Sequence, residues 1–571
     1  MKKRNFALMA ILVAFLALGV FSPRIVQSSH LNEAATPTPT PSIHKRISHF
    51  TVETQLYEWW MVRWKNNRYV CNIKIEHEGL PRGSEIYDSC GAERYEDWYD
   101  TPPCEQAKNG GDVSQCSGVY LLYDGEGTGS KEVDVELPLP NVWLSLKGCE
   151  YTPPTYTCSS QPYLVLEGNE PLPNETIITI NGYLDGEPFS CAGSVCELPL
   201  QPTGEQGIDV EFWADSSFGD SSETYTSLVR ALPQGDFSDP EGDGMDDQLW
   251  LADVLSSQWV GERPASCSDI WQVFPDATGL PTWLQTPYNS ADLQSSVSYY
   301  YLAARLINQG MVDVSKCPDG GLTRSGVASE CGVQASRTKL DEWQNDFNND
   351  ILTVSNKTGV PAQLLKNLFS RESQFWPGIF TTYMEAGLGQ MSEYGADTLL
   401  LWNEGFYNQF CPLVLSQDTC DKGFAQLSEE AQNLLRGALV QTVDASCATC
   451  AMGIDLSQAN FSVEVFANTL VANCQQVNQL IYNITQEDTR TLAGYEDLWR
   501  FTLVNYNAGA GCLAGALEKT YDDDDPLDWQ HVKISLEEEC PGTSDYVEDI
   551  TIFPVPAPTP TPWVQPSVTS P

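Results

Sequence analysis

The spacing of apolar residues changes at about residue 240, and this change constrains the fold more than any other feature of the sequence. Before it, apolar and polar residues alternate in short runs such as TIITINGYLDG and GIDVEFWAD, separated by turn residues, which is typical of β-strands. After it, apolar residues recur every three to four positions, which predicts helices. Because 571 residues exceed what one core normally spans, we predict a multidomain α+β protein with β modules first and an all-α domain after them.

Composition suggests where these parts begin and end. Residues from about 47 to 105 are rich in Trp, Tyr and Cys, and the strand-like runs that follow are spaced as in an immunoglobulin-like sandwich. Pro/Thr-rich segments near both ends cannot build a core and are expected to be extended spacers. The predicted division is a signal peptide or signal anchor at 1–30, a Pro/Thr linker at 31–46, a small disulfide-stapled β module at 47–108, an immunoglobulin-like β-sandwich at 109–235, a connecting, partly helical segment at 236–330, an all-α domain at 331–545 and a Pro/Thr-rich tail at 546–571.

The N-terminus and the cysteines indicate export. A basic start precedes an apolar run from Phe6 to Phe21, as in a secretory signal or an uncleaved signal anchor. The 18 cysteines, an even number in an exported chain, favour disulfides over metal thiolates. Expected pairs include Cys149 with Cys158 and Cys191 with Cys196, whereas the two cysteines of CATC at 447–450 are expected to pair with others. We therefore predict an extracellular or cell-envelope protein, with anchoring by the N-terminal segment left open.

Charge and histidine content exclude several function classes. A formal net charge of −46 argues against binding to nucleic acid or to anionic membranes. None of the five histidines lies between residues 78 and 530, which disfavours Ser–His and Cys–His catalysis, and no zinc-hydrolase or phosphate-loop motif is present. The acidic run at 239–247 could ligate calcium but lacks the spacing of a calcium loop, so we interpret it as a solvated linker. We predict no metal and no cofactor, which leaves carboxylate chemistry or none.

One carboxylate lies on the apolar stripe of a predicted helix. In VPAQLLKNLFSRESQF, Glu372 follows Leu365 by seven residues and Leu368 by four, so it continues that stripe toward the interior or a cleft. Burial raises a carboxyl pKa, and a carboxyl protonated near neutral pH is what a glycosidic bond needs as a general acid. The alternative is a helix-end carboxylate paired with Arg371 or a lysine. Aromatic residues that could stack on sugars lie nearby in sequence: Phe375, Trp376, Phe380, Tyr383, Trp402, Phe406 and Tyr407.

Three motifs resemble those of the lytic transglycosylase catalytic domain, in the soluble transglycosylase and goose-lysozyme superfamily. The first is the E-S pair Glu372-Ser373, which ends a helix that opens V-P-x-x-L-L. The second, GLGQM at 387–391, is similar to the family's G-L-M-Q-M/L box, and its Gln390 follows the acid by 18 residues, as is typical of the family. The third, NYNAGAG at 505–511, is similar to A-Y-N-A-G-x-G. The resemblance covers about residues 340–520 and implies a lysozyme-like all-α domain.

The resemblance also implies roles for single residues. Glu372 would be the sole catalytic residue, first as acid and then as base, and Ser373 would help to position it. Gln390 would hydrogen-bond substrate near the acid, and Tyr506 would support the acid or the sugar from across the cleft. Further substrate contacts are expected from Gly387, Phe375, Met391 and Asn507.

Two departures from the family pattern leave the function open. Gly389 replaces the usual Met, which predicts a wider cleft, and Glu385 offers a second carboxylate. Our first hypothesis is cleavage of the β-1,4 bond between N-acetylmuramic acid and N-acetylglucosamine in peptidoglycan, with a 1,6-anhydro product. If Glu385 or Asp397 held a water molecule opposite the acid, the enzyme would instead hydrolyse the bond, as a lysozyme- or chitin-type glycosidase does. A non-catalytic surface-binding or scaffold protein is the other alternative. The expected partner is peptidoglycan or a related N-acetylhexosamine glycan, and the oligomeric state is left open.

Overall fold

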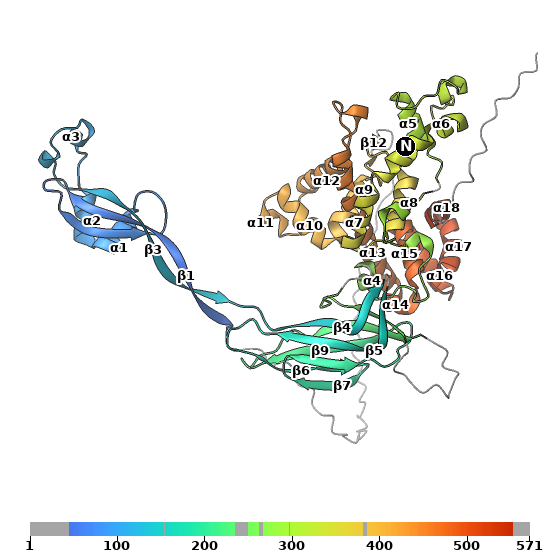
Figure 1. Ribbon diagram of the computed structural model, residues 1–571, viewed down its shortest axis with the longest axis horizontal. Helices are drawn as coiled ribbons and strands as arrows, with labels where there is room; N and C mark the ends of the chain where they lie inside the picture. The colour runs from blue at the N-terminus through green and yellow to red at the C-terminus, as the bar shows by residue number, and fades with distance from the viewer. Residues whose placement is uncertain are drawn as a thin grey trace, which may run out of the picture.

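The N-terminal half of the chain forms β-sheets and the C-terminal half forms helices, which confirms the predicted α+β order (Figure 1). The computed structural model describes residues 45–551, except 153–154, 235–248, 262–265, 296 and 381–384. The predicted signal segment, the acidic run at 239–247 and most of the tail lie outside the described residues. Among the helices described, none combines the length and the apolar character that crossing a membrane requires.

A long antiparallel ribbon, here called the arm, projects from the rest of the molecule (Figure 1). Its strands are β1 (Ile47–Arg63) and β3 (Val119–Glu136). They pair from Ile47 opposite Glu136 at the root to Arg63 opposite Val119 at the far end. The prediction that residues after 109 belong to the sandwich is therefore wrong for β3. The two runs GVYLLYDG and EVDVELPL fall on one continuous strand, and its partner is β1.

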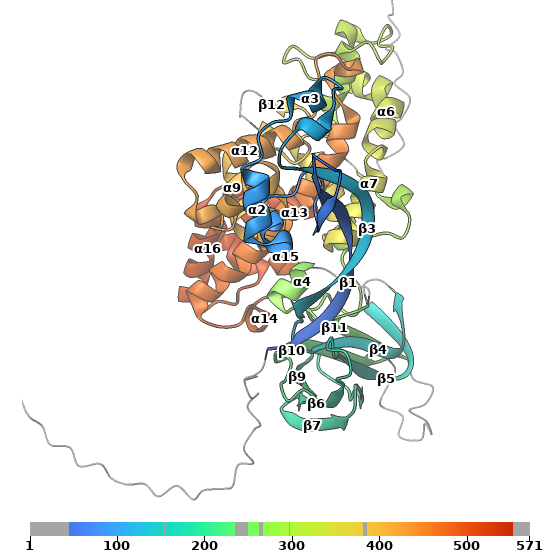
Figure 2. The ribbon, with the colours of Figure 1, turned by 90° about the vertical axis from the view of Figure 1, so that its left-hand side faces the viewer.

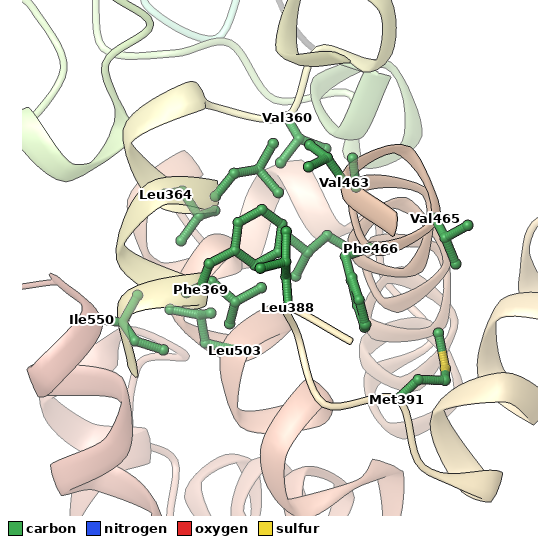
Figure 3. Close-up of a cluster of buried hydrophobic side chains, with 14 of the residues drawn as sticks. Val360, Leu364, Phe369, Leu388, Met391, Val463, Val465, Phe466, Leu503 and Ile550 are labelled. Atoms are coloured by element: carbon green, nitrogen blue, oxygen red, sulfur yellow. The ribbon is translucent and has the colours of Figure 1, made fainter. Parts of the chain in front are cut away.

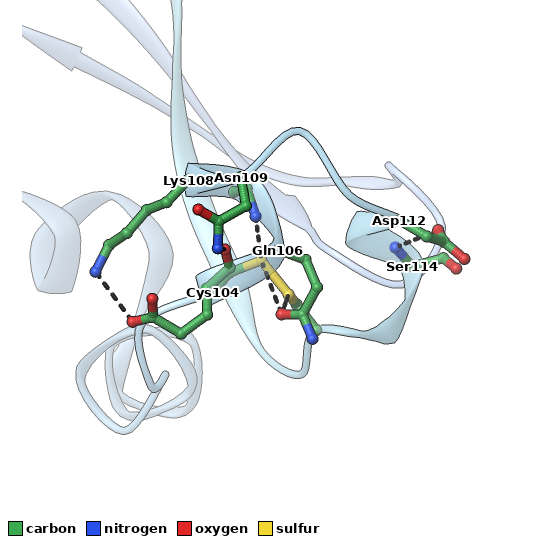
Figure 4. Close-up of a disulfide and its surroundings, with 9 residues drawn as sticks. Cys104, Gln106, Lys108, Asn109, Asp112 and Ser114 are labelled. Carbon is green, nitrogen blue, oxygen red and sulfur yellow. Dashed lines mark hydrogen bonds and ion pairs between the residues drawn. A yellow bond between two sulfur atoms is a disulfide. The ribbon is translucent and has the colours of Figure 1, made fainter.

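The far end of the arm carries a small disulfide-stapled unit, here called the tip module (residues 57–123). Its other elements are β2 (Tyr69–Ile75), α1 (Gly83–Cys90), α2 (Ala92–Tyr99), α3 (Glu105–Lys108) and η1 (Val113–Gln115). The core is small and comprises Met61, Ile73, Ile75, Ile86 and Val119. Disulfides Cys71–Cys90 and Cys104–Cys116 close the module, and Figure 4 shows the second of them beside α3. So few buried side chains need such cross-links for stability.

The root of the arm is fixed by a buried ionic cluster. Arg46 is 4% exposed, and its guanidinium donates to both carboxylate oxygens of Asp220, at 2.7 and 2.8 Å, and to Glu170. Its Nε donates to the carbonyl of Pro138 at 2.8 Å. Because both carboxylates belong to the sheet domain, the cluster ties the start of β1 to that domain.

The sheet domain comprises eight antiparallel strands: β4 (Asn141–Thr152), β5 (Thr155–Asn169), β6 (Ile177–Leu184), β7 (Glu187–Ala192), β8 (Val195–Pro199), β9 (Ile208–Ser216), β10 (Tyr225–Pro233) and β11 (Trp250–Leu255). The strand order is β4-β5-β11-β10-β9-β6-β7, and β8 also pairs with β5, so hydrogen bonds join all eight into one sheet. Disulfides Cys149–Cys158 and Cys191–Cys196 confirm the two predicted pairs. Strand β11 lies in the segment predicted to be a connection.

The helical domain contains the short strands β12 (Ile379–Phe380) and β13 (Glu385–Ala386) and the helices α4 (Ser266–Trp271), α5 (Tyr300–Asn308), α6 (Glu330–Asn345), α7 (Asn348–Thr358), α8 (Ala362–Glu372), α9 (Glu393–Trp402), α10 (Glu404–Phe410), α11 (Gln417–Cys420), α12 (Glu429–Val443), α13 (Leu456–Thr485), α14 (Thr489–Leu492), α15 (Tyr495–Ala508), α16 (Ala510–Asp522), α17 (Trp529–Glu539) and α18 (Thr543–Thr551). One hydrophobic core runs from Cys267 to Ile550. Disulfide Cys267–Cys474 joins α4 to α13. The helical domain thus begins near residue 266, not 331, and the predicted boundary at 545 falls inside α18.

Helix α8 packs at the centre of this domain. Its residues from Ala362 to Ser370 are all buried. Figure 3 shows its side chains packed against those of α13, α15 and α18, with Val360, Leu364, Phe369, Leu388, Val463, Phe466, Leu503 and Ile550 labelled. Burial of this much apolar surface on every side fixes the position of the helix and therefore of its last residue, Glu372.

Candidate active site

Glu372 is the last residue of α8, and the chain turns sharply after it. Ser373 closes the helix, and its hydroxyl donates to the carbonyl of Phe369 at 3.3 Å. Gln374 and Phe375 then adopt positive φ angles of 50° and 61°. The Gln374 side chain accepts a hydrogen bond from the Tyr301 backbone N–H at 2.8 Å, which anchors the turn. The turn therefore ends α8 directly after Glu372, and the carboxyl of Glu372 lies at the end of the helix.

The carboxyl of Glu372 is half-buried and held by one tyrosine. The Tyr546 hydroxyl donates a hydrogen bond to its Oε1 atom. The pKa of Glu372 is raised to about 7, because desolvation, helped by the nearby charge of Glu385, outweighs the Tyr546 hydrogen bond and the Arg371 charge, which lower it. Both protonation states are therefore populated near neutral pH, as predicted for a general acid.

Arg371 does not form the ion pair that was the alternative for Glu372. Its Nε atom lies 3.0 Å from the Asp549 carboxylate, and its guanidinium carbon lies 5.4 Å from the centre of the Tyr546 ring. The Glu372 carboxyl thus has a hydroxyl rather than a guanidinium as its direct partner, which explains why desolvation controls its pKa.

Tyr546 is a site residue that sequence analysis missed. It is 5% exposed and lies on α18, in the segment assigned to the Pro/Thr-rich tail. Helix α18 docks on α8 through two further contacts: Asn367 donates to the carbonyl of Ile550 at 2.7 Å, and Arg371 pairs with Asp549. Tyr546, Val547 and Ile550 have the spacing of a buried helix face, so the sequence contains a signal for the helix but not for its contact with Glu372.

Tyr506 contacts the GLGQM segment, and its predicted support of the acid or the sugar stays a prediction. Its hydroxyl donates to the carbonyl of Gly389. Burial raises the pKa of Tyr506 well above its usual range, and the nearby charges of Glu372 and Glu385 add to this effect. Three residues from distant parts of the sequence are therefore close enough to influence one another's ionisation.

Gly389 does not widen the cleft. An added Cβ at this position would lie 2.4 Å from the Phe466 ring and 2.7 Å from the Tyr506 hydroxyl. The Phe466 ring therefore occupies the space that a side chain at 389 would take, and no side chain fits there.

A pocket of about 520 Å³ opens beside Tyr506. Its walls come from α9, α13, α15 and α16, and Gln390, Met391, Trp402, Tyr506 and Asn507 are among the lining residues. Gln390 has a φ of 57°, and its amide donates to the carbonyl of Gly387 at 2.7 Å. Glu372 itself does not line this pocket, whereas Tyr506, whose pKa the Glu372 charge raises, does.

Other predicted substrate contacts turn inward. Phe375 is fully buried and packs against Phe347 and Phe369, so the prediction that it contacts substrate is wrong. The positive φ at positions 374 and 375 directs its ring into the core. Met391 is 2% exposed, belongs to the hydrophobic cluster of Figure 3 and also lines the pocket. Gly387 is buried against Val443, where an added Cβ would lie 2.8 Å from the backbone oxygen.

Most of the aromatic residues near Glu372 in sequence are also structural. Trp376 is 6% exposed and stacks on Trp343, and Tyr407 is 3% exposed. Phe406 stacks on Phe410 in a different groove. Tyr383 lies outside the described residues. Of the aromatics predicted to face sugars, Trp402 is the one that lines the pocket next to Tyr506.

Two further carboxylates were candidates for holding a water molecule. Glu385, on β13, is half-buried, and desolvation raises its pKa. Asp397 lines the pocket, but its carboxylate is engaged by Arg436, with Nε to Oδ1 at 2.6 Å. Glu385 is therefore the better placed of the two to act with Glu372.

The cysteines form disulfides throughout the described chain. All 18 pair in nine bonds, and no group of three or more metal-ligating side chains is found among the residues that the structure describes. Cys447 and Cys450 bond to each other, so the prediction that they pair with other cysteines is wrong. The turn between them allows it, because Cys450 N–H donates to the carbonyl of Cys447 at 3.2 Å.

Comparisons with known proteins add nothing to this geometry. No protein-family model matches the chain, and searches of curated proteins and of solved structures also found no match.

Proposed function

We propose that this protein is an exported peptidoglycan-cleaving enzyme, a lytic transglycosylase, with Glu372 as its catalytic residue. The observation that carries the proposal is the state of the Glu372 carboxyl, which accepts a hydrogen bond from Tyr546 and has a pKa of about 7. Tyr506, whose pKa responds to the Glu372 charge, lines the nearby pocket. The proposal includes a lysozyme-like fold for the helical domain and an immunoglobulin-like fold for the sheet domain. The nine disulfides fit an extracellular protein.

Glu372 acts first as a general acid. Its proton passes to the glycosidic oxygen as the bond to C1 of N-acetylmuramic acid breaks, and the N-acetyl carbonyl oxygen of the same sugar stabilises the cation that forms at C1. The carboxylate that results then accepts the proton of the sugar's 6-hydroxyl, whose oxygen bonds to C1 and closes the 1,6-anhydro ring. A pKa of about 7 lets one side chain perform both steps near neutral pH.

The two tyrosines support this cycle in different ways. Tyr546 donates to Oε1 of Glu372 and so fixes the orientation of the carboxyl. Tyr506, through its bond to the carbonyl of Gly389, holds the GLGQM segment next to the acid. Gln390 and Asn507, which line the pocket, are available to hydrogen-bond the sugar.

Hydrolysis is the second candidate, and Glu385 favours it. Its charge raises the pKa of Glu372, and its own pKa is raised by burial, so it is a nearby carboxylate that could hold a water molecule. Attack by that water would replace ring closure and give a product like that of a lysozyme.

The test is product analysis after incubation of the purified chain with peptidoglycan. Mass spectrometry should find 1,6-anhydro muropeptides, each lighter by one water than the hydrolysed product. Reducing ends without anhydro sugars would support hydrolysis instead. Binding without any product would support the non-catalytic scaffold and overturn the enzymatic proposal.

A further inference from the structure

The tip module carries a second pocket, at the opposite end of the arm from the sheet domain (Figure 1). In Figure 2, where the tip module faces the viewer, β1 and β3 run from it down to that domain. The pocket has a volume of about 390 Å³. It is lined mainly by aromatic and proline side chains: Trp64, Trp98, Tyr99, Tyr120, Pro102 and Pro103.

Trp98 packs against the core of the tip module, but core packing does not account for Trp64, Tyr99 and Tyr120. Tyr99 is 71% exposed, although it is one of the largest side chains in the module. Its ring stacks on Tyr95, with 5.9 Å between ring centres and 24° between ring planes. Trp64 and Tyr120 face each other at 4.1 Å across the ends of β1 and β3. The small core of the tip module, which includes Ile73 and Ile86, borders the pocket at Val119. The pocket therefore has aromatic side chains outside the core, among them the exposed Tyr99, that a ligand can contact.

The charges around the pocket favour an uncharged ligand. No lysine or arginine lines it. Helix α2, which supplies Trp98 and Tyr99, has the sequence AERYEDWY and is followed by Asp100, so it carries more acidic than basic residues. Its one arginine, Arg94, is engaged by Asp97 at 3.1 Å. An anionic polymer would be repelled by this surface, whereas a neutral one would not.

We propose that the tip pocket binds a neutral N-acetylhexosamine glycan chain, as a second glycan site separate from the catalytic cleft. Pyranose rings have an apolar C–H face that can bury area on Trp64, Trp98 and Tyr99, and a polar rim that tyrosine hydroxyls can reach. The choice of sugar rests on the proposed function, because N-acetylglucosamine is the uncharged sugar of the two that alternate in the proposed substrate. With the arm fixed at its root by Arg46, occupation of one site raises the effective concentration of the same polymer at the other.

The test uses the full chain with the substitution Glu372→Gln, so that bound glycan is not cleaved. Retention on chitin and tryptophan fluorescence titration with N-acetylglucosamine oligomers measure binding. Tyr99→Ala and Trp64→Ala should each weaken binding about tenfold, as expected for an aromatic side chain at the centre of a binding site. Because Tyr99 is exposed, its substitution leaves folding intact even if that of Trp64 does not. Tyr69→Ala is the matched control, since Tyr69 is 55% exposed on the same module and does not line the pocket.

The outcomes separate this proposal from that for the helical domain. Equal binding by the Tyr99→Ala variant and the Tyr69→Ala control would overturn the tip site. Binding of a proline-rich peptide or an anionic polysaccharide in place of chitin would overturn its ligand class. Cleavage is measured independently, with short soluble muropeptides and the chain that keeps Glu372. If the chain binds glycan through Tyr99 but does not cleave muropeptides, the proposed function is wrong and the tip site stands.

Discussion

The Tyr546 hydroxyl donates a hydrogen bond to Glu372 across 174 residues of sequence. This bond joins the last described helix, α18, to the end of α8. It favours the charged form of Glu372, while desolvation favours the neutral form more strongly, and the balance leaves the pKa at about 7. The C-terminal helix is therefore part of the candidate active site rather than an appendage.

Replacement of Tyr546 by Phe should shift the pH dependence of cleavage. The lost hydrogen bond stabilised the carboxylate, so the pKa of Glu372 rises further. Because the general acid must be protonated, the alkaline limb of the rate profile moves to higher pH, and the rate at the optimum falls because the carboxyl is less well oriented. Tyr407→Phe is the control, since that buried tyrosine donates to the carbonyl of Cys420 instead. An unmoved limb in Tyr546→Phe would argue against the role assigned to this bond.

Glu372 should also make stability depend on pH. Its folded-state pKa of about 7 lies above the ordinary value of 4.5, so its contribution is fully present below pH 4.5 and is lost as the pH rises through 7. Glu372→Gln should therefore stabilise the protein at pH 8 by on the order of 2 kcal/mol and have little effect at pH 4. Denaturant unfolding at both pH values measures this. Glu372→Gln is compared with the parent at the same pH, because Lys366, whose pKa burial lowers to about 7, makes the stability of both proteins rise with pH above 7.

Gly389→Ala should destabilise the helical domain by about 1–3 kcal/mol, because an added methyl group would overlap the Phe466 ring. Gly437→Ala, in the middle of α12 with nothing near an added Cβ, is the matched control and should be neutral or stabilising. Thermal unfolding compares the two. Similar melting temperatures for both variants would show that the Phe466 ring can move aside at little cost and that position 389 tolerates a side chain.

Arg46→Ala should loosen the arm from the sheet domain. The substitution leaves the carboxylates of Glu170 and Asp220 buried without their partner, which typically costs about 3–5 kcal/mol. Lys45→Ala removes an exposed pair with Glu136 and should have almost no effect. Hydrogen exchange of the β1 and β3 amides near the root should increase in the first variant alone.

The sequence was sufficient to predict elements whose pattern is local. The apolar stripe of α8 predicted both the helix and the inward position of Glu372, and alternation predicted strands before residue 235. Strand pairing is not local, so nothing in the runs of β3 indicated that its partner would be β1 rather than a sandwich strand. The buried position of Phe375 was not predicted, because it depends on left-handed backbone angles at Gln374 and Phe375. Non-glycine residues seldom adopt these angles, so the sequence does not indicate them.

The candidate site divides in the same way. The resemblance implied a role for Tyr506 beside the acid or the sugar, but it did not indicate the hydrogen bond from the Tyr506 hydroxyl to the carbonyl of Gly389. Tyr546 was not predicted as a site residue, because composition placed it at the start of the Pro/Thr-rich tail. Its contact with Glu372 depends on how α18 packs on α8. The effect of Gly389 was misjudged because it depends on Phe466, a residue far away in the sequence.

The most direct test of the central claim compares cleavage of peptidoglycan by the parent chain and by Glu372→Gln at pH 6. The amide keeps the size of the side chain but cannot give up or accept the proton, so release of muropeptides should fall at least about 100-fold while the circular dichroism spectrum stays unchanged. Glu404→Gln, an exposed residue on α10, should cleave like the parent. Cleavage by Glu372→Gln at the parent rate would contradict the account.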